Sequence, residues 1–162
     1  MQTILCFHKP EEPYGFLSNW YPSQFKKDGV VFSSMEQYMM YYKAICFHDT
    51  KTAADILHTD NAGAIKAFGR AVKNYDNIIW NGYRQLIVYE GLLEKFRQNE
   101  MLQEKLLATG NAILAECAVQ DMIWGIGLSM RDEKRFSMRA WRGQNLLGFT
   151  LMQVREKYKS EI

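Results

Sequence analysis

Apolar residues at helical spacing constrain this chain more than any other feature, because they recur along most of its length. Between residues 33 and 46 they form a stripe at i, i+3 and i+4 intervals, and Ser33 with Glu36 fits a capping box that begins a helix. Asp49 and Asp60 are suitable N-caps for two shorter helices, near 50–57 and 61–69. The stripe consists of Met35, Tyr38, Met39, Tyr42, Ile45 and Cys46.

The second half of the chain has the same character. A helix is predicted over 80–96, a short one over 101–107 that stops at Thr109-Gly110, and a last one that begins near Asn145. We expect the buried faces of the first and last of these helices to consist of Leu86, Tyr89, Leu93 and Phe96, and of Leu147, Leu151, Val154 and Tyr158.

Strand-like segments are few and short. Runs at 4–7 and 112–118 read as strands, and 25–27 with 30–32 flank Asp28-Gly29, a strong hairpin signal because glycine tolerates a positive φ. The order of elements lacks the βαβ alternation of a doubly wound sheet, and Gly125-x-Gly127 is not a dinucleotide fingerprint because the third glycine is absent. The sequence therefore predicts an α+β fold, a mostly helical single domain over 1–162 with few short strands.

Composition excludes some classes of function. The 20 basic and 18 acidic side chains leave a net charge of only +2, too weak a field to argue for a grip on long nucleic acid. Three cysteines and three histidines are scattered without metal-ligand or disulfide spacing, so we expect no metal and no cofactor. The sequence contains no apolar run long enough for a signal peptide or a bilayer span, and we expect a cytoplasmic protein without membrane contact. It leaves the oligomeric state open.

Glu36 and Lys43 form the first candidate site. They are seven residues apart on the predicted helix, so they point within about 20° of each other and lie roughly 10 Å apart along its axis. Two long side chains at that spacing can converge on a ligand. A capping Glu and a Lys that snorkels at the edge of a core explain the same residues without any ligand.

Two further segments have the composition of a binding site. Asp121 precedes Trp124-Gly125-Ile126-Gly127, where glycines let the backbone approach phosphate oxygens and the Trp can stack on a base; a tight turn is the alternative. Ser18-Asn19-Trp20 offers an amide for a ribose hydroxyl and an aromatic ring, although asparagine is commoner in turns. Arg70 can bind phosphate or be an ordinary surface charge.

Together these segments resemble the NADAR family, also described as YbiA-like, over nearly the whole chain. The matching segments are Phe16-Leu17-Ser18-Asn19-Trp20, Asp28-Gly29, Phe32-Ser33-Ser34-Met35-Glu36-Gln37-Tyr38, Lys43-Ala44, Gly69-Arg70, Trp80 with Arg84, Lys95-Phe96, Leu106 to Gly110, Asp121-x-x-Trp124-Gly125-Ile126-Gly127 and Trp141-x-Gly143-x-Asn145-Leu146-Leu147-Gly148. Two positions depart from the family pattern: Gln37 stands where His is frequent, and Trp20 where Phe is frequent.

The resemblance implies a YbiA-like fold and hydrolysis of the N-glycosidic bond of ribosyl phosphate compounds, such as the early reactive intermediates of riboflavin biosynthesis. The alternatives are a hydrolase that removes ADP-ribose from modified guanine in nucleic acid, and a module that binds ADP-ribose without catalysis. The resemblance assigns catalysis to Glu36, Lys43 and Asp121, and Lys43 would act either as an acid or as a Schiff-base nucleophile. Substrate binding is assigned to Ser18, Asn19, Trp20, Arg70, Trp124, Gly125 and Gly127.

Overall fold

The computed structural model describes residues 2–162, which divide into two compact units. Of these residues, 2–21 and 100–162 form one unit, which we call the terminal unit, and Pro22–Asn99 form the other, which we call the hairpin unit. The described residues contain six α-helices and four short strands, so the predicted α+β, mostly helical fold is confirmed.

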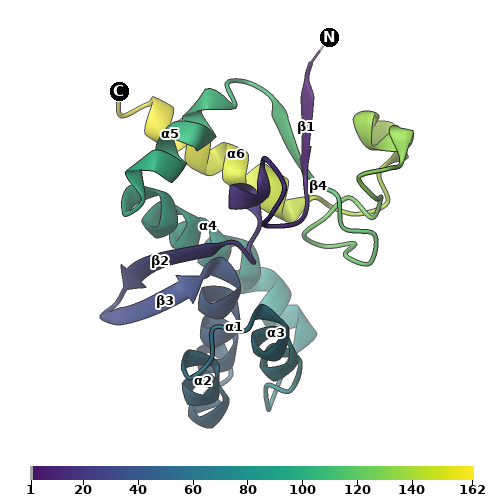
Figure 1. Cartoon of the computed structure of the whole chain (residues 1–162). Helices are drawn as coiled ribbons and strands as arrows, with labels where there is room; N and C mark the ends of the chain where they lie inside the picture. Colours follow the sequence, from purple (N-terminus) through teal and green to yellow (C-terminus); the bar gives the residue numbers. More distant parts are fainter. Residues whose placement is uncertain (1) are drawn as a thin grey trace. The chain divides into compact units, whose positions relative to one another are not determined.

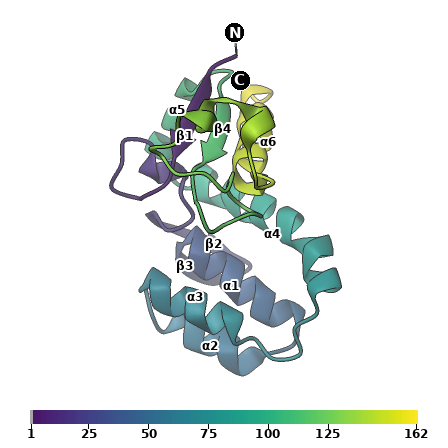
Figure 2. The same cartoon turned by 90° about the vertical axis from the view of Figure 1, so that its right-hand side faces the viewer.

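The hairpin unit begins with the two strands that give it its name. β2 (Pro22–Lys27) and β3 (Val30–Ser34) pair antiparallel around Asp28 and Gly29, both of which have positive φ, as the predicted tight turn requires. Four helices follow: α1 (Met35–Cys46), α2 (Thr50–Leu57), α3 (Ala62–Arg70) and α4 (Asn77–Arg97). Helix α1 packs against the other three and against β3, which makes it the centre of this unit (Figures 1 and 2).

Helices α1 and α4 approach closely at Gly91. A Cβ atom there would lie 2.3 Å from Cε1 of Tyr38, and the Tyr38 hydroxyl donates to the carbonyl of Ile87 at 2.9 Å.

The predicted buried face of α4 is partly wrong: Phe96 is buried, but Leu86 is exposed. The buried residues are Trp80, Arg84, Val88, Gly91, Leu92, Lys95 and Phe96, a face that includes two basic residues and a glycine.

Two smaller predictions in this unit also need correction. The N-cap of α3 is Asn61, whose side chain accepts from the Ala64 N–H, and not Asp60. On α1 the predicted stripe holds for Met35, Tyr38 and Met39, but Ile45 is 37% exposed near the end of the helix. Asp49 caps α2 as predicted, accepting from the N–H of Thr52 at 3.1 Å.

The terminal unit is organised around two parallel strands. β1 (Ile4–Phe7) pairs with β4 (Ile113–Glu116), and α6 (Leu146–Lys159) lies alongside β4 (Figures 1 and 2). The predicted buried face of α6 is confirmed in full. Helix α5 (Glu100–Ala108) ends before Gly110, which has φ +60°, and three 3-10 turns complete the unit: η1 (Gly15–Leu17), η2 (Glu133–Phe136) and η3 (Met138–Ala140).

No helix within residues 2–162 is both long and apolar enough to cross a bilayer. Nothing in the fold bears on the predicted cytoplasmic location, which stays a prediction.

Candidate functional site

The beginning of α1 differs by one residue from the prediction, and the difference concerns a candidate catalytic residue. The N-cap is Ser34, whose hydroxyl accepts from the N–H of Gln37 at 3.2 Å. Ser33 still belongs to β3, because Ser34 itself pairs with Pro22 across the hairpin. The predicted Ser33–Glu36 capping box is therefore wrong. Glu36 occupies the second position of the helix, where the N-terminal end of the helix dipole favours a negative side chain.

Gln37 has a structural role beside this cap. Its Oε1 accepts from both the N–H and the hydroxyl of Ser33, at 2.7 and 3.1 Å, and its Nε2 donates to the carbonyls of Ile56 and Thr59, at 3.1 and 3.0 Å. The amide is buried and joins the beginning of α1 to the end of α2. Gln37, which replaces the frequent His of the family pattern, therefore serves to hold two parts of the hairpin unit together.

Glu36 and Arg70 both act electrostatically on Lys43 within the hairpin unit. Glu36 is only 4% exposed, whereas Lys43 is half-buried and Arg70 is exposed at the end of α3. Burial lowers the pKa of Lys43 from its ordinary value, the Glu36 carboxylate opposes that shift, and the Arg70 guanidinium adds to it. A buried carboxylate and an amine with a lowered pKa therefore lie near each other, two turns apart on one helix.

An aromatic residue that the sequence analysis did not select lies beside Lys43. The Lys43 Nζ atom is 4.5 Å from the centroid of the Tyr75 ring, in the segment between α3 and α4. Tyr75 is 43% exposed. The available signal was an aromatic side chain in the polar stretch Lys73-Asn74-Tyr75-Asp76, between two helices.

Ser18, Asn19 and Trp20 follow η1 in the terminal unit. The Ser18 hydroxyl accepts from the Trp20 N–H at 3.2 Å, which fixes a local turn. Asn19 is 6% exposed, and its Oδ1 atom has no hydrogen-bond partner among residues 2–162. Trp20 is 41% exposed. A buried carbonyl oxygen without a partner is costly, so Asn19 is the residue here whose chemistry most calls for a ligand.

Asp121 and the glycines after it form a compact turn in the terminal unit. Asp121 Oδ1 accepts from the N–H groups of Ile123 and Trp124, at 2.9 and 2.8 Å. Gly127 has φ +70°, and a Cβ on Gly125 would lie about 3.0 Å from its neighbours. Local packing therefore explains both glycines and one carboxylate oxygen of Asp121. Their predicted contacts with substrate stay predictions.

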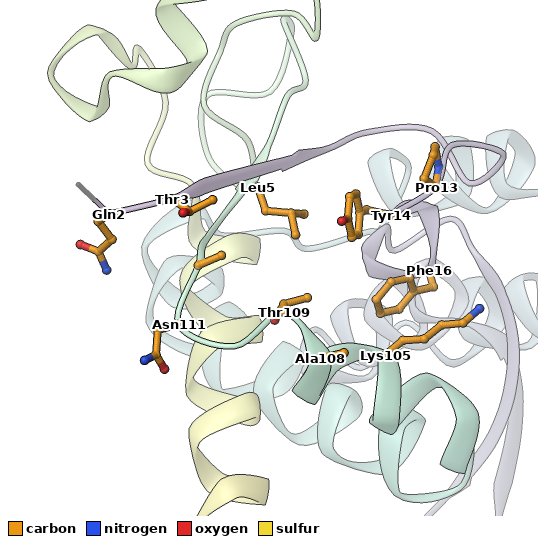
Figure 3. A pocket seen from close by; sticks show the side chains of 11 residues that line it. Gln2, Thr3, Leu5, Pro13, Tyr14, Phe16, Lys105, Ala108, Thr109 and Asn111 are labelled. Carbon is orange, nitrogen blue, oxygen red and sulfur yellow. The ribbon is translucent and has the colours of Figure 1, made fainter.

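The terminal unit also contains a cavity of about 720 Å³ that includes none of the predicted site residues. In Figure 3 the side chains of Leu5, Tyr14 and Phe16 border the same space, and Lys105 extends beside Phe16. The Lys105 Nζ atom lies 5.9 Å from the centroid of the Phe16 ring. The cavity is lined by Gln2, Thr3, Leu5, Pro13, Tyr14, Phe16, Lys105, Ala108, Thr109, Asn111 and Ala112.

Metal chemistry has no candidate centre within residues 2–162, since no three His, Cys, Asp or Glu side chains in this range are grouped to hold an ion. Within the hairpin unit the candidate residues are Glu36, Lys43, Arg70 and Tyr75. Within the terminal unit they are the Ser18–Trp20 and Asp121–Gly127 segments.

Comparison with known proteins shows similarity along almost the whole chain. The NADAR domain family profile matches residues 6–159. N-glycosidase R617 of Acanthamoeba polyphaga mimivirus is 40% identical over 145 residues, which cover 86% of this chain and 85% of that protein. Riboflavin biosynthesis protein VVA0006 of Vibrio vulnificus is 31% identical over 157 residues, which cover 97% of this chain but 39% of that longer protein. The NMR structure of the Escherichia coli protein YbiA matches with a TM-score of 0.82 and 29% identity, over 99% of this chain and 88% of that chain.

Proposed function

This chain belongs to the NADAR family, and on that premise we propose that it is an N-glycosidase that hydrolyses the bond between ribose C1 and nitrogen in ribosyl phosphate compounds. Relatives named N-glycosidase support the type of reaction. The relative named riboflavin biosynthesis protein supports the choice of substrate, the early reactive intermediates of that pathway.

The pairing of Glu36 with Lys43 is the observation that carries the proposal. Cleavage of a glycosidic bond develops positive charge at C1, and a carboxylate held out of water stabilises such charge more strongly than an exposed one. Glu36 meets that requirement because it is buried in the first turn of α1, where the cap bond is made by Ser34 and Gln37. We assign it to the stabilisation of C1 or to the activation of water.

Lys43 has two chemical roles open to it. As an ammonium it can protonate the leaving nitrogen, which departs with the electron pair of the C1–N bond. As a neutral amine it can attack C1 of the ring-opened sugar, displace the leaving nitrogen and form a Schiff base that water then hydrolyses. The lowered pKa supports the second role, because a larger fraction of Lys43 is then neutral at a given pH.

The remaining predicted residues are proposed to bind the substrate. The partnerless Oδ1 of Asn19 can accept a ribose hydroxyl, and the exposed ring of Trp20 can stack on a base. We assign phosphate to Arg70. Asp121 is kept as the second carboxylate of the reaction, and the Trp124–Gly127 segment as a second contact with the base and phosphate.

The test is product analysis by liquid chromatography and mass spectrometry with two substrates. One tube receives the ribosylaminouracil phosphate intermediate and the other an ADP-ribosylated guanine oligonucleotide. Release of ribose 5-phosphate in the first tube supports the proposal. Release of ADP-ribose in the second tube alone replaces it with reversal of nucleic-acid modification, and binding of ADP-ribose without turnover of either replaces it with a binding module.

Variants connect the activity to α1. We expect Glu36→Gln, which keeps the shape and removes the charge, to lower kcat by roughly 100-fold or more while leaving the thermal midpoint close to wild type. Lys43→Ala should abolish turnover but retain ligand binding, and Lys134→Ala, an exposed lysine in η2, is the matched control. Trapping with borohydride distinguishes the two roles of Lys43, because only a Schiff base gives a stable adduct on that residue.

A further inference from the structure

The contact between Lys43 and Tyr75 joins a proposed catalytic group to a side chain from a different segment. The two residues are 32 positions apart in the sequence, and the Nζ–centroid distance of 4.5 Å lies within the range of a cation–π interaction. The electron-rich face of the ring attracts the ammonium form of lysine and has no comparable interaction with the neutral amine.

The Tyr75 ring is fixed by contacts that do not involve Lys43. It meets the ring of Phe47 edge-on, with centroids 5.4 Å apart and planes at 63°, and its hydroxyl donates to Asn77 Oδ1 at 2.9 Å. Phe47 is buried at the end of α1, and Asn77 is the first residue of α4. The ring is therefore held between two helices.

The backbone that carries Tyr75 is fixed as well. Asp49 Oδ2 accepts from the N–H of Lys73 at 2.9 Å, while the same carboxylate caps α2 through Thr52. Asp76 caps α4 by accepting from the N–H groups of Ile78 and Ile79. Both ends of this short segment are thus attached to helix termini, so the ring keeps its place without help from a ligand.

We infer that Tyr75 is a positioning residue for the ammonium form of Lys43, which it holds by its ring face in the orientation that protonation of the leaving nitrogen uses, the first of the two roles proposed for Lys43. This inference rests on the proposed function, because it gives Tyr75 a purpose only if Lys43 serves catalysis. The charged groups that act on Lys43 are Glu36 on the same helix and Arg70 on α3. Burial and Arg70 lower the pKa of Lys43, and Glu36 raises it. Tyr75 acts in the same direction as Glu36, because its ring favours the ammonium form.

Three variants test the inference. Tyr75→Phe retains the ring, Tyr75→Leu removes it, and Tyr83→Leu makes the same change at another exposed tyrosine, on α4. Lysine labelled with ¹³C at Cε allows an NMR titration of Lys43, assigned with Lys43→Arg, and this measurement does not depend on turnover. We expect Tyr75→Leu to lower the Lys43 pKa by about 0.4–0.7 units, from the typical strength of an exposed cation–π contact, and the other two variants to leave it unchanged.

Kinetics provide the second readout. With the ribosylaminouracil phosphate substrate, Tyr75→Leu should reduce kcat several-fold with little change in KM and shift the pH profile in the same direction as the titration, while Tyr75→Phe restores both. An unchanged Lys43 pKa in Tyr75→Leu overturns the inference, as does a Tyr75→Phe variant that behaves like Tyr75→Leu. If the wild type turns over neither substrate, the proposed function fails, and the NMR titration still decides whether Tyr75 holds Lys43.

Discussion

Replacing Gln37 by alanine should destabilise the hairpin unit strongly without removing any group assigned to catalysis. The side chain makes four hydrogen bonds, two as acceptor from Ser33 and two as donor to the carbonyls of Ile56 and Thr59. All are made by a side chain that is almost inaccessible to solvent. The truncation leaves these partners unpaired, with the Ile56 carbonyl in a buried position and the groups of Ser33 and Thr59 in partly buried ones.

The magnitude follows from the number of bonds and their burial. A typical hydrogen bond contributes about 1 kcal/mol net, and an orphaned buried partner costs about 1–3 kcal/mol. Because two of the four bonds go to the same Ser33 residue and relax together, we expect a total loss of roughly 3 kcal/mol in the free energy of unfolding. For a chain of 162 residues this corresponds to a fall of roughly 6–12 °C in the thermal midpoint.

Urea and thermal unfolding followed by circular dichroism measure the effect, with Gln153→Ala on the exposed side of α6 as the matched control. Gln37→Glu is a sharper variant, because a carboxylate still accepts from Ser33 but cannot donate to Ile56 and Thr59. It should cost at least as much as alanine. A loss below about 1 kcal/mol for Gln37→Ala, no larger than one ordinary hydrogen bond, would refute the scaffold role of this amide.

Two further predictions concern α4. Gly91→Ala should lower the free energy of unfolding by about 1–3 kcal/mol, because its Cβ would lie 2.3 Å from the Tyr38 ring; Gly82→Ala, where nothing lies within 4 Å, should instead stabilise by up to about 1 kcal/mol. Equal effects in urea melts would contradict the close approach. Burial lowers the pKa of Lys95 to about 7, so the unfolded chain binds more protons above that pH, and stability should rise between pH 7 and 10. Lys95→Met should flatten this rise, and an unaltered slope would count against the buried, neutral lysine.

Local signals were enough to predict much of the fold. The Asp28-Gly29 turn, the Asp49 cap and the apolar face of α6 depend on residues close together in the sequence, and all three are confirmed. The buried face of α4 was not predictable in this way. Apolar periodicity pointed to Leu86, whereas the helix buries Arg84 and a glycine that admits a ring from α1. Which face is buried depends there on a partner helix more than 40 residues earlier in the chain.

The sequence supplied candidate residues for the site but not their surroundings. Spacing on one helix made Glu36 and Lys43 candidates, and composition did the same for the two terminal-unit segments, but only the family resemblance favoured a function over a structural role. Tyr75 carries no such signal, because its relation to Lys43 arises only when the segment after α3 is attached to Asp49 and Asp76. A contact between two segments that are distant in the sequence cannot be predicted from the spacing of residues within either segment.

At the beginning of α1, a contact between the two strands of the hairpin determines which residue caps the helix. Ser33 and Ser34 are equally good N-caps by sequence, and the choice determines whether Glu36 or Gln37 stands at the third helical position. Pairing of Ser34 with Pro22 extends β3 by one residue and assigns the cap to Ser34. The cap then engages Gln37, which can donate as well as accept and so joins α1 to α2, a bond pattern that a carboxylate could not form. Glu36 stands one position before Gln37, about two turns from Lys43 along the same helix. The register of the hairpin therefore gives the structural role at the beginning of α1 to Gln37, and leaves the neighbouring Glu36 as the residue proposed to act on the substrate.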